Sequence, residues 1–300
     1  MKTFPHFSIR TGRDASPVVS FGMTQPTVID YLKQLQQQGV SHVEVDDEAR
    51  KILREFYRRG SASPKKGTSQ PTPTQTTAAA TPVKAELVIT GTTPAEKIAS
   101  LKNQCLNWAP TKALGTLRNQ MVFSCGNPEA DLMLVGEAPG YHDEKKQEPF
   151  MGPAGEKLDQ IVKAMGLSRE EIYISNLCKF RPSMKNQTMG NRKPSADEMA
   201  ANLPFLRAEI DIVKPRVIIA LGGTAAEGLL AESKAVSQFR EAWHQFQGIP
   251  LRVSYHPSYL LRQSEGTSEK RMVWEDMLAA MDKLGLPVSE KQRGYFLPKK

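Results

Sequence analysis

Four short apolar segments that alternate with helical patterns constrain the fold of this chain more than any other feature. Short strands that are apolar throughout are typical of a parallel sheet that is buried on both faces, and the intervening helices cover those faces. The pattern predicts an α/β fold, a three-layer α/β/α sandwich around a central, mostly parallel, four-stranded sheet. The predicted strands are Leu132–Val135, Ile172–Leu177, Arg216–Leu221 and Leu251–Tyr255, and the predicted helices include Pro153–Met165 and a segment that a capping box at Ser195 and Glu198 opens.

Two loops of distinctive composition follow predicted strands far apart in the chain. One reads Gly136-Glu-Ala-Pro-Gly140, and the other reads His256-Pro-Ser-Tyr-Leu-Leu261. Ligands of open α/β sheets bind beyond the carboxyl ends of the strands. An acid on one such loop and a histidine on the other therefore predict a site that acts on a small polar group.

The N-terminal third differs in composition from the rest. Residues 1–60 are predicted to form a small helical segment, because apolar residues recur at helical spacing in two stretches. This segment is too small to bury much surface alone, so it docks either on the main domain or on an unknown protein partner. Residues 61–93 are rich in Pro, Thr and Ala and are predicted to be a flexible linker. Residues 94–300 are predicted to form one domain.

Composition narrows the partner and the compartment. The 40 basic residues exceed the 32 acidic ones, which gives a net charge of +8. That charge favours a polyanionic partner such as nucleic acid, although an ordinary basic soluble protein has a similar balance. The three cysteines include no close pair, which is typical of a reducing cytoplasm. No apolar run approaches the roughly 20 residues of a membrane span. We expect a cytoplasmic monomer without membrane contact.

A series of motifs along residues 100–285 resembles the uracil-DNA glycosylase superfamily, and most closely its family 4. The motifs are the two loops above with Glu148–Gly155, Tyr173–Asn176, Lys179–Pro182 and Leu221–Ala225. The resemblance implies a DNA repair enzyme that acts on DNA containing uracil. Such an enzyme flips the base out of the stack, hydrolyses its N-glycosidic bond and leaves an abasic site. The resemblance also implies a monofunctional hydrolase.

One part of the family pattern is missing. Family 4 members usually hold a four-iron, four-sulfur cluster on four cysteines, and only Cys105 matches here. The other three positions correspond to Trp108, Phe180 and Asn202. We therefore expect no cluster, no other metal and no cofactor, with Trp108 and Phe180 filling the vacated space. A rearranged site on Cys105, Cys125 and Cys178 is a weaker alternative, because such clusters normally take four ligands.

The resemblance assigns roles to individual residues of the base site. Phe150 would stack on the flipped uracil, and Asn176 would read its N3–H and O4 with one amide. His256 would donate to O2, where negative charge develops as the base leaves. Gly136 and Ala138 are expected to line the same pocket. A water molecule would be oriented by either Glu137 or Asp143, and the sequence leaves that choice open.

The second loop is also expected to contact DNA. Its residues resemble an intercalating loop of the superfamily, in which an apolar side chain fills the gap that the flipped base leaves. The alternative is that its apolar residues begin a buried helix face. Nearby basic residues contact phosphates or are ordinary solvated charges. The expected loop contacts are Ser258, Tyr259, Leu260, Leu261 and Arg262, and the basic residues are Lys179, Arg181, Lys185, Arg192 and Lys193.

Two other functions remain open on the sequence alone. An enzyme of the same fold could prefer another base, such as hypoxanthine. A degenerate domain could bind DNA or a protein without catalysis, and the missing cysteines favour that alternative. Retention of Glu137, Phe150, Asn176 and His256 favours an active enzyme, because a relic has no physical need for all four.

Overall fold

The computed structural model describes residues 9–10, 44–45, 86–262 and 267–297, and the chain divides into two units, Met1–Ala79 and Ala80–Lys300. In the first unit, strands β1 (Ile9–Arg10) and β2 (Glu44–Val45) pair in an antiparallel arrangement. The two helices predicted within residues 1–60 lie outside the described residues, as does most of the predicted linker.

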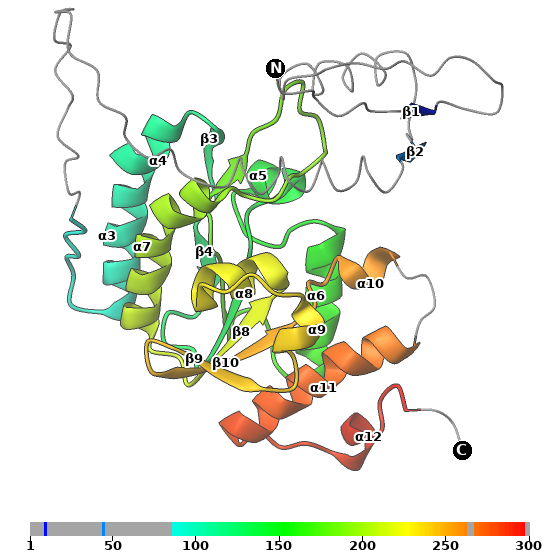
Figure 1. Ribbon diagram of the computed structural model, residues 1–300. Coiled ribbons are helices and arrows are strands. Elements are labelled where there is room, and N and C mark those ends of the chain that lie inside the picture. The colour runs from blue at the N-terminus through cyan, green and yellow to red at the C-terminus, as the bar shows by residue number, and fades with distance from the viewer. Residues whose placement is uncertain (1–8, 11–43, 46–85, 263–266, 298–300) are drawn as a thin grey trace, which may run out of the picture. The chain divides into compact units, whose positions relative to one another are not determined.

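A six-stranded sheet forms the centre of the second unit (Figure 1). The four strands expected from the sequence are all present and run parallel in the order β6-β5-β8-β10. Two antiparallel edge strands flank them, so the predicted number of four was too low. The strands, in sheet order, are β4 (Ser124–Gly126), β6 (Tyr173–Asn176), β5 (Leu132–Gly136), β8 (Val217–Leu221), β10 (Ile249–Ser254) and β9 (Trp243–Phe246).

Helices cover both faces of this sheet, which confirms the three-layer α/β arrangement. Alternate strand residues point to opposite faces. Met133, Ile218 and Val253 pack with helices α7 and α8 on one face. Leu134 and Ile219 pack with α6 and α11 on the other. The helices of this unit are α3 (Pro94–Leu106), α4 (Ala109–Leu114), α5 (Tyr141–Lys146), α6 (Pro153–Ala164), α7 (Ala196–Val213), α8 (Gly223–Leu230), α9 (Val236–Phe239), α10 (Tyr259–Arg262), α11 (Thr267–Leu284) and α12 (Glu290–Arg293).

A third apolar cluster lies at the corner where α3 and α4 contact α7. It joins α3 and α7 to a small antiparallel pair, β3 (Leu117–Met121) and β7 (Phe180–Pro182). Trp108, Phe180 and Phe205 are buried in this cluster. Residues just before α3 are also anchored here, because the Val88 N–H donates to Gln104 Oε1 on α3 at 2.8 Å.

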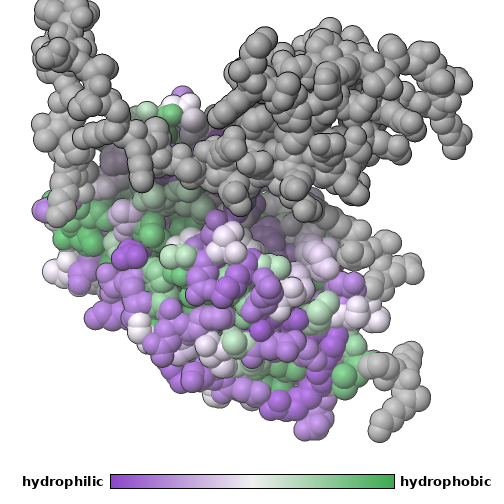
Figure 2. Space-filling model, viewed as in Figure 1, coloured by the Kyte–Doolittle hydropathy of each residue, from purple (hydrophilic) through white to green (hydrophobic). Residues whose placement is uncertain are grey.

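Helix starts follow the local sequence. The predicted capping box is present, with the Ser195 side chain accepting from the Glu198 N–H and the Glu198 carboxylate accepting from the Ser195 N–H. Thr93 and Glu96 make the same arrangement at α3. On the face that Figure 2 shows, hydrophilic residues predominate between scattered apolar ones. No helix in the described part of the chain is long and apolar enough to cross a bilayer.

Candidate functional site

A cavity of about 430 Å³ lies where the parallel strands end. The loops after β5 and β10 contribute Glu137 and His256 to its lining, the last residue of β6 contributes Asn176, and the loop before α6 contributes Phe150. This is the edge at which open α/β sheets bind ligands. The structure thus brings together residues that the sequence placed on separate loops, and Gly140, Asp143 and Ser258 line the same cavity.

Gly136, expected to line the pocket, is not among the residues that line the cavity, but its lack of a side chain leaves room for Asn176 and Phe150. It is the last residue of β5 and lies opposite Asn176 in the β5–β6 register. A Cβ atom at position 136 would lie 2.2 Å from Asn176 Oδ1 and 2.7 Å from Phe150 Cζ. Any larger residue would therefore displace the two side chains that are expected to bind the base.

Asn176 presents an amide group whose donor is unsatisfied. Its side chain is 2% exposed. Within the described residues, Asn176 Nδ2 is buried without a hydrogen-bond partner. Buried donors are rarely left unpaired, so an unpartnered donor on a residue that lines a cavity is a candidate contact for a ligand acceptor. The sequence predicted this residue as the base reader, and that role stays a prediction.

His256 lies over the Phe150 ring, with the ring centroids 5.6 Å apart and the planes inclined by 28°. The Ser258 N–H donates to His256 Nδ1 at 3.2 Å, and Ser258 Oγ lies 2.8 Å from the same nitrogen. Since a backbone N–H can only donate, Nδ1 must accept. The neutral ring therefore carries its hydrogen on Nε2. Ser258 was expected to contact DNA. In this structure it fixes the tautomer of the His256 ring.

The two candidate acids differ in how their carboxylates are engaged. Asp143 accepts from the Gly140 N–H at 2.9 Å with one oxygen and from the Met151 N–H at 2.7 Å with the other. Glu137 lines the cavity, and its carboxylate has no hydrogen bond or ion pair with the described residues. A carboxylate whose oxygens already accept from backbone amides is less able to orient water than one that faces a cavity.

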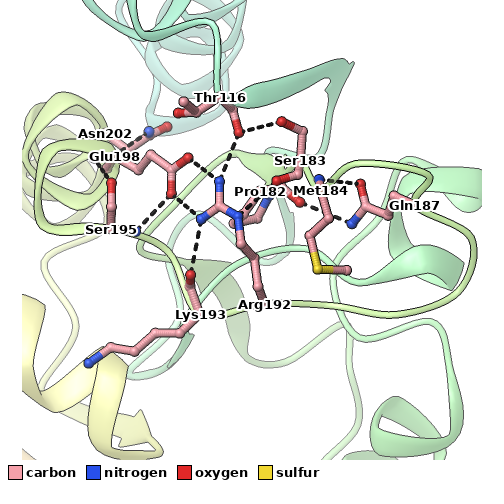
Figure 3. A network of polar contacts seen from close by, with 10 residues as sticks. All are labelled: Thr116, Pro182, Ser183, Met184, Gln187, Arg192, Lys193, Ser195, Glu198 and Asn202. Carbon is pink, nitrogen blue, oxygen red and sulfur yellow. Dashed lines mark hydrogen bonds and ion pairs between the residues drawn. The ribbon is translucent and has the colours of Figure 1, made fainter. Parts of the chain in front are cut away.

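One wall of the cavity is formed by the loop between β7 and α7, and Arg192 holds it (Figure 3). Its guanidinium donates to both carboxylate oxygens of Glu198, at 2.6 and 2.8 Å. It also donates to the carbonyls of Ser183 and Thr116 at 2.8 and 3.0 Å. Burial acts to raise the pKa of Glu198, but the hydrogen bonds and charge of Arg192 lower it to about 2.

Several basic residues predicted as phosphate contacts have other roles. Lys179 and Arg181 are 0% and 1% exposed. Lys179 forms an ion pair with the buried Glu209 and donates to the Asn176 carbonyl at 2.8 Å. Arg181 forms an ion pair with Glu144. These charges are therefore internal and cannot reach a phosphate in this conformation.

The His256 loop continues into α10, where its apolar residues diverge. Leu260 is 9% exposed and packs in the cluster under α6 and α11. Tyr259 stacks on Tyr255, with ring centroids 4.6 Å apart. Leu261 is 46% exposed. The predicted wedge was centred on Leu260, but Leu260 is buried here and Leu261 is the exposed one of the two leucines. Elsewhere in the site, Ala138 lines the cavity at the ends of the parallel strands, where the sequence placed it.

The residues at the family's cluster positions do not fit an iron–sulfur cluster. Cys105 is buried, and burial raises its pKa to about 12. Trp108 packs edge-on against Phe205 with ring centroids 5.1 Å apart, and Phe180 lies in the same cluster. Asn202 is engaged by the Lys179 N–H and the Glu198 carbonyl. Over the described residues, no three Cys, His, Asp or Glu side chains are grouped as metal ligands.

Sequence reasoning missed Arg169, which contacts the Phe150 loop. It also missed the roles of Ser258 and Asp143 as supports for other site residues. No local signal marks these roles, because each depends on a backbone group that the fold brings close.

Comparisons with known proteins identify the family of this chain. A sequence model described as the Uracil DNA glycosylase superfamily matches residues 123–278. The chain belongs to this superfamily. A type-4 uracil-DNA glycosylase of Thermotoga maritima is 36% identical over 163 residues, which are 53% of this chain and 81% of that protein. The Saccharolobus solfataricus type-4 enzyme is 39% identical, over 49% of this chain and 67% of its own length. A type-5 uracil-DNA glycosylase of Thermus thermophilus is 30% identical, over 54% and 79%.

Proposed function

We propose that this superfamily member is a uracil-DNA glycosylase that acts in DNA repair. It flips uracil out of DNA and hydrolyses the N-glycosidic bond to leave an abasic site. The observation that carries the proposal is the buried, unpartnered Nδ2 of Asn176 beside Phe150. An amide donor there suits uracil O4, and the amide oxygen suits N3–H. Cytosine presents the reverse pattern and would leave the buried amide mismatched.

His256 stabilises the leaving base in this mechanism. Its ring hydrogen lies on Nε2 because Nδ1 accepts from Ser258. A neutral imidazole donor directed at uracil O2 stabilises negative charge as the bond breaks, and loss of one such donor typically costs 10²- to 10³-fold in rate, about 3–4 kcal/mol. Phe150 stacks on the base and fixes its plane.

Glu137 is the residue we assign to the water molecule and to the developing sugar cation. Its carboxylate faces the cavity, whereas both oxygens of Asp143 accept from backbone N–H groups. The sequence left this choice open, and the difference in engagement favours Glu137. Replacement of Glu137 by Gln should therefore lower the rate at the chemical step more than DNA binding.

On the DNA side, we propose Leu261 as the wedge that fills the space left by the flipped base. It is the exposed apolar residue of the His256 loop, while Leu260 supports the loop from the core. We further propose that the protein works without an iron–sulfur cluster, because Trp108 and Phe180 pack where the family's ligands would stand.

The test is alkaline scission of oligonucleotides containing uracil or inosine. Wild type should cleave at uracil, and Asn176→Ala and His256→Ala should each lose about 10²-fold or more in single-turnover rate. Asn103→Ala, an exposed asparagine on α3, is the matched control and should match wild type. Cleavage only at inosine would establish the hypoxanthine alternative. DNA binding without cleavage by wild type would establish the degenerate-domain alternative.

A further inference from the structure

The peptide group between Phe150 and Met151 is held at both of its polar ends by charged side chains. Its carbonyl oxygen, on Phe150, accepts from Arg169 Nη2 at 2.6 Å. Its N–H, on Met151, donates to Asp143 Oδ1 at 2.7 Å. A cation therefore faces the negative end of the peptide dipole and an anion faces the positive end, which is the arrangement that makes charge-assisted hydrogen bonds strongest.

Phe150 needs such support because its backbone is in an uncommon conformation. Its φ is +58°, in the left-handed region that bulky residues rarely adopt. A conformation of this kind costs about 1–3 kcal/mol and persists only when its surroundings fix it. The left-handed conformation also requires one orientation of the following peptide. If that peptide flipped, its carbonyl would face the Asp143 carboxylate and its N–H would face the Arg169 guanidinium.

Both charged residues are anchored beyond this peptide. Arg169 also donates to the Pro149 carbonyl at 3.1 Å, and its Nε donates to Asp159 at 2.8 Å. The second oxygen of Asp143 accepts from the Gly140 N–H. On the opposite side, a Cβ atom at Gly155 would lie 1.7 Å from the Phe150 carbonyl oxygen, so the backbone of α6 closes against the same group.

We propose that Arg169 and Asp143 are positioning residues that clamp the Phe150–Met151 peptide and so direct the Phe150 ring into the base cavity. The inference rests on the proposed function, in which Phe150 stacks on the flipped base. Under it, Asp143 acts on the reaction through the position of Phe150 and not by holding water. Lysine cannot replace Arg169, because an ammonium lacks the planar fork that reaches two carbonyls and an acid together.

The experiment is a double-mutant cycle read by single-turnover cleavage of a uracil oligonucleotide. Arg169→Lys and Asp143→Asn should each lower the rate constant about 10- to 100-fold, the range expected when a reacting group is misplaced. In a Phe150→Ala background each should change the rate constant less than about 2-fold, because the ring through which they act is gone. Arg216→Lys, at an exposed ion pair with Asp131, is the control and should match wild type.

A purely structural role gives different results. Lost stability lowers the fraction of folded enzyme and leaves the rate constant at saturating enzyme unchanged. An effect on the reaction that does not pass through Phe150 lowers the rate constant by a factor that multiplies with that of Phe150→Ala. Either result overturns the clamp. The pH dependence of the rate should keep its shape in Asp143→Asn, and loss of its acidic limb would instead assign Asp143 to catalysis.

A second readout does not need activity. Hydrogen exchange of the segment 148–153 should be faster in Arg169→Lys than in wild type, while Arg216→Lys leaves it unchanged. If wild type fails to cleave uracil, the proposed function falls, and this exchange measurement still decides the clamp. Equal exchange in wild type and Arg169→Lys refutes it.

Discussion

Removal of the buried cation Lys179 gives the sharpest test of how the site is supported. Lys179 and Glu209 are both fully buried and form an ion pair between the strand β6 side of the sheet and α7. Lys179→Met would leave the Glu209 carboxylate buried, with the hydroxyls of Tyr173 and Ser175 as its remaining donors among the described residues. Breaking a buried pair from one side typically costs about 3–5 kcal/mol.

The double variant Lys179→Met/Glu209→Gln separates charge from packing. Its residue 209 is neutral and still accepts from Tyr173. The Asn176 carbonyl loses its Lys179 donor in both variants, which costs about 1–3 kcal/mol. The double variant should therefore be more stable than the single one and less stable than wild type.

Urea unfolding followed by circular dichroism measures both effects. If the free energy of unfolding falls by about 3 kcal/mol per molar urea, the single variant should lower the urea midpoint of unfolding by roughly 1–2 M. Lys102→Met, an exposed position on α3, is the matched control and should not shift it. A loss below about 1 kcal/mol in the single variant, or a double variant no more stable than the single one, would refute the reasoning.

Three further outcomes are expected. Gly136→Ala should lower uracil cleavage at least about 10²-fold in a single-turnover assay, because its Cβ would clash with Asn176 and Phe150, while Gly294→Ala, with only ordinary contacts, should stay near wild type. The pKa of Glu198 is lowered to about 2, so the stability that it contributes is present above about pH 4.5 and is lost as the pH falls towards 2. Thermal unfolding of Glu198→Gln should then depend less on pH across that window, and an unchanged acid dependence would contradict the assignment. Trp108→Ala should cost about 3–5 kcal/mol in urea unfolding, as truncation of a buried aromatic does, and a cost below about 1 kcal/mol would show that the corner does not depend on it.

Much of the fold was predictable because it depends on local pattern. The parallel strands are continuous apolar runs. Glu137, Asn176 and His256 stand at or just after the carboxyl ends of such strands, so the sequence placed them at one edge of the sheet. Strands β4 and β9 escaped prediction because they are short edge strands with polar residues such as Gln245, which lack the pattern of a buried strand.

The supports of the site could not be predicted in the same way. A lysine is normally an exposed residue, so the sequence predicts Lys179 at the surface. Its burial depends on the ion pair with Glu209 on α7, which only the fold brings close. Arg169 contacts main-chain carbonyls of a loop, and carbonyls have no sequence signature. Leu260 and Leu261 are adjacent and chemically identical, so only the direction of α10 decides which one is exposed.

The apolar corner of Trp108, Phe180 and Phe205 has a consequence for how the protein matures. On the proposal that these side chains take the place of the family's cluster, α3 and α7 are held together by side chains of the polypeptide alone. No delivery of iron or sulfide then stands between synthesis and a finished enzyme. Oxidants that dismantle exposed clusters would also find nothing to attack at this corner. Repair capacity would therefore be independent of the cell's iron supply, and yields of folded protein should be equal from iron-starved and iron-replete cultures.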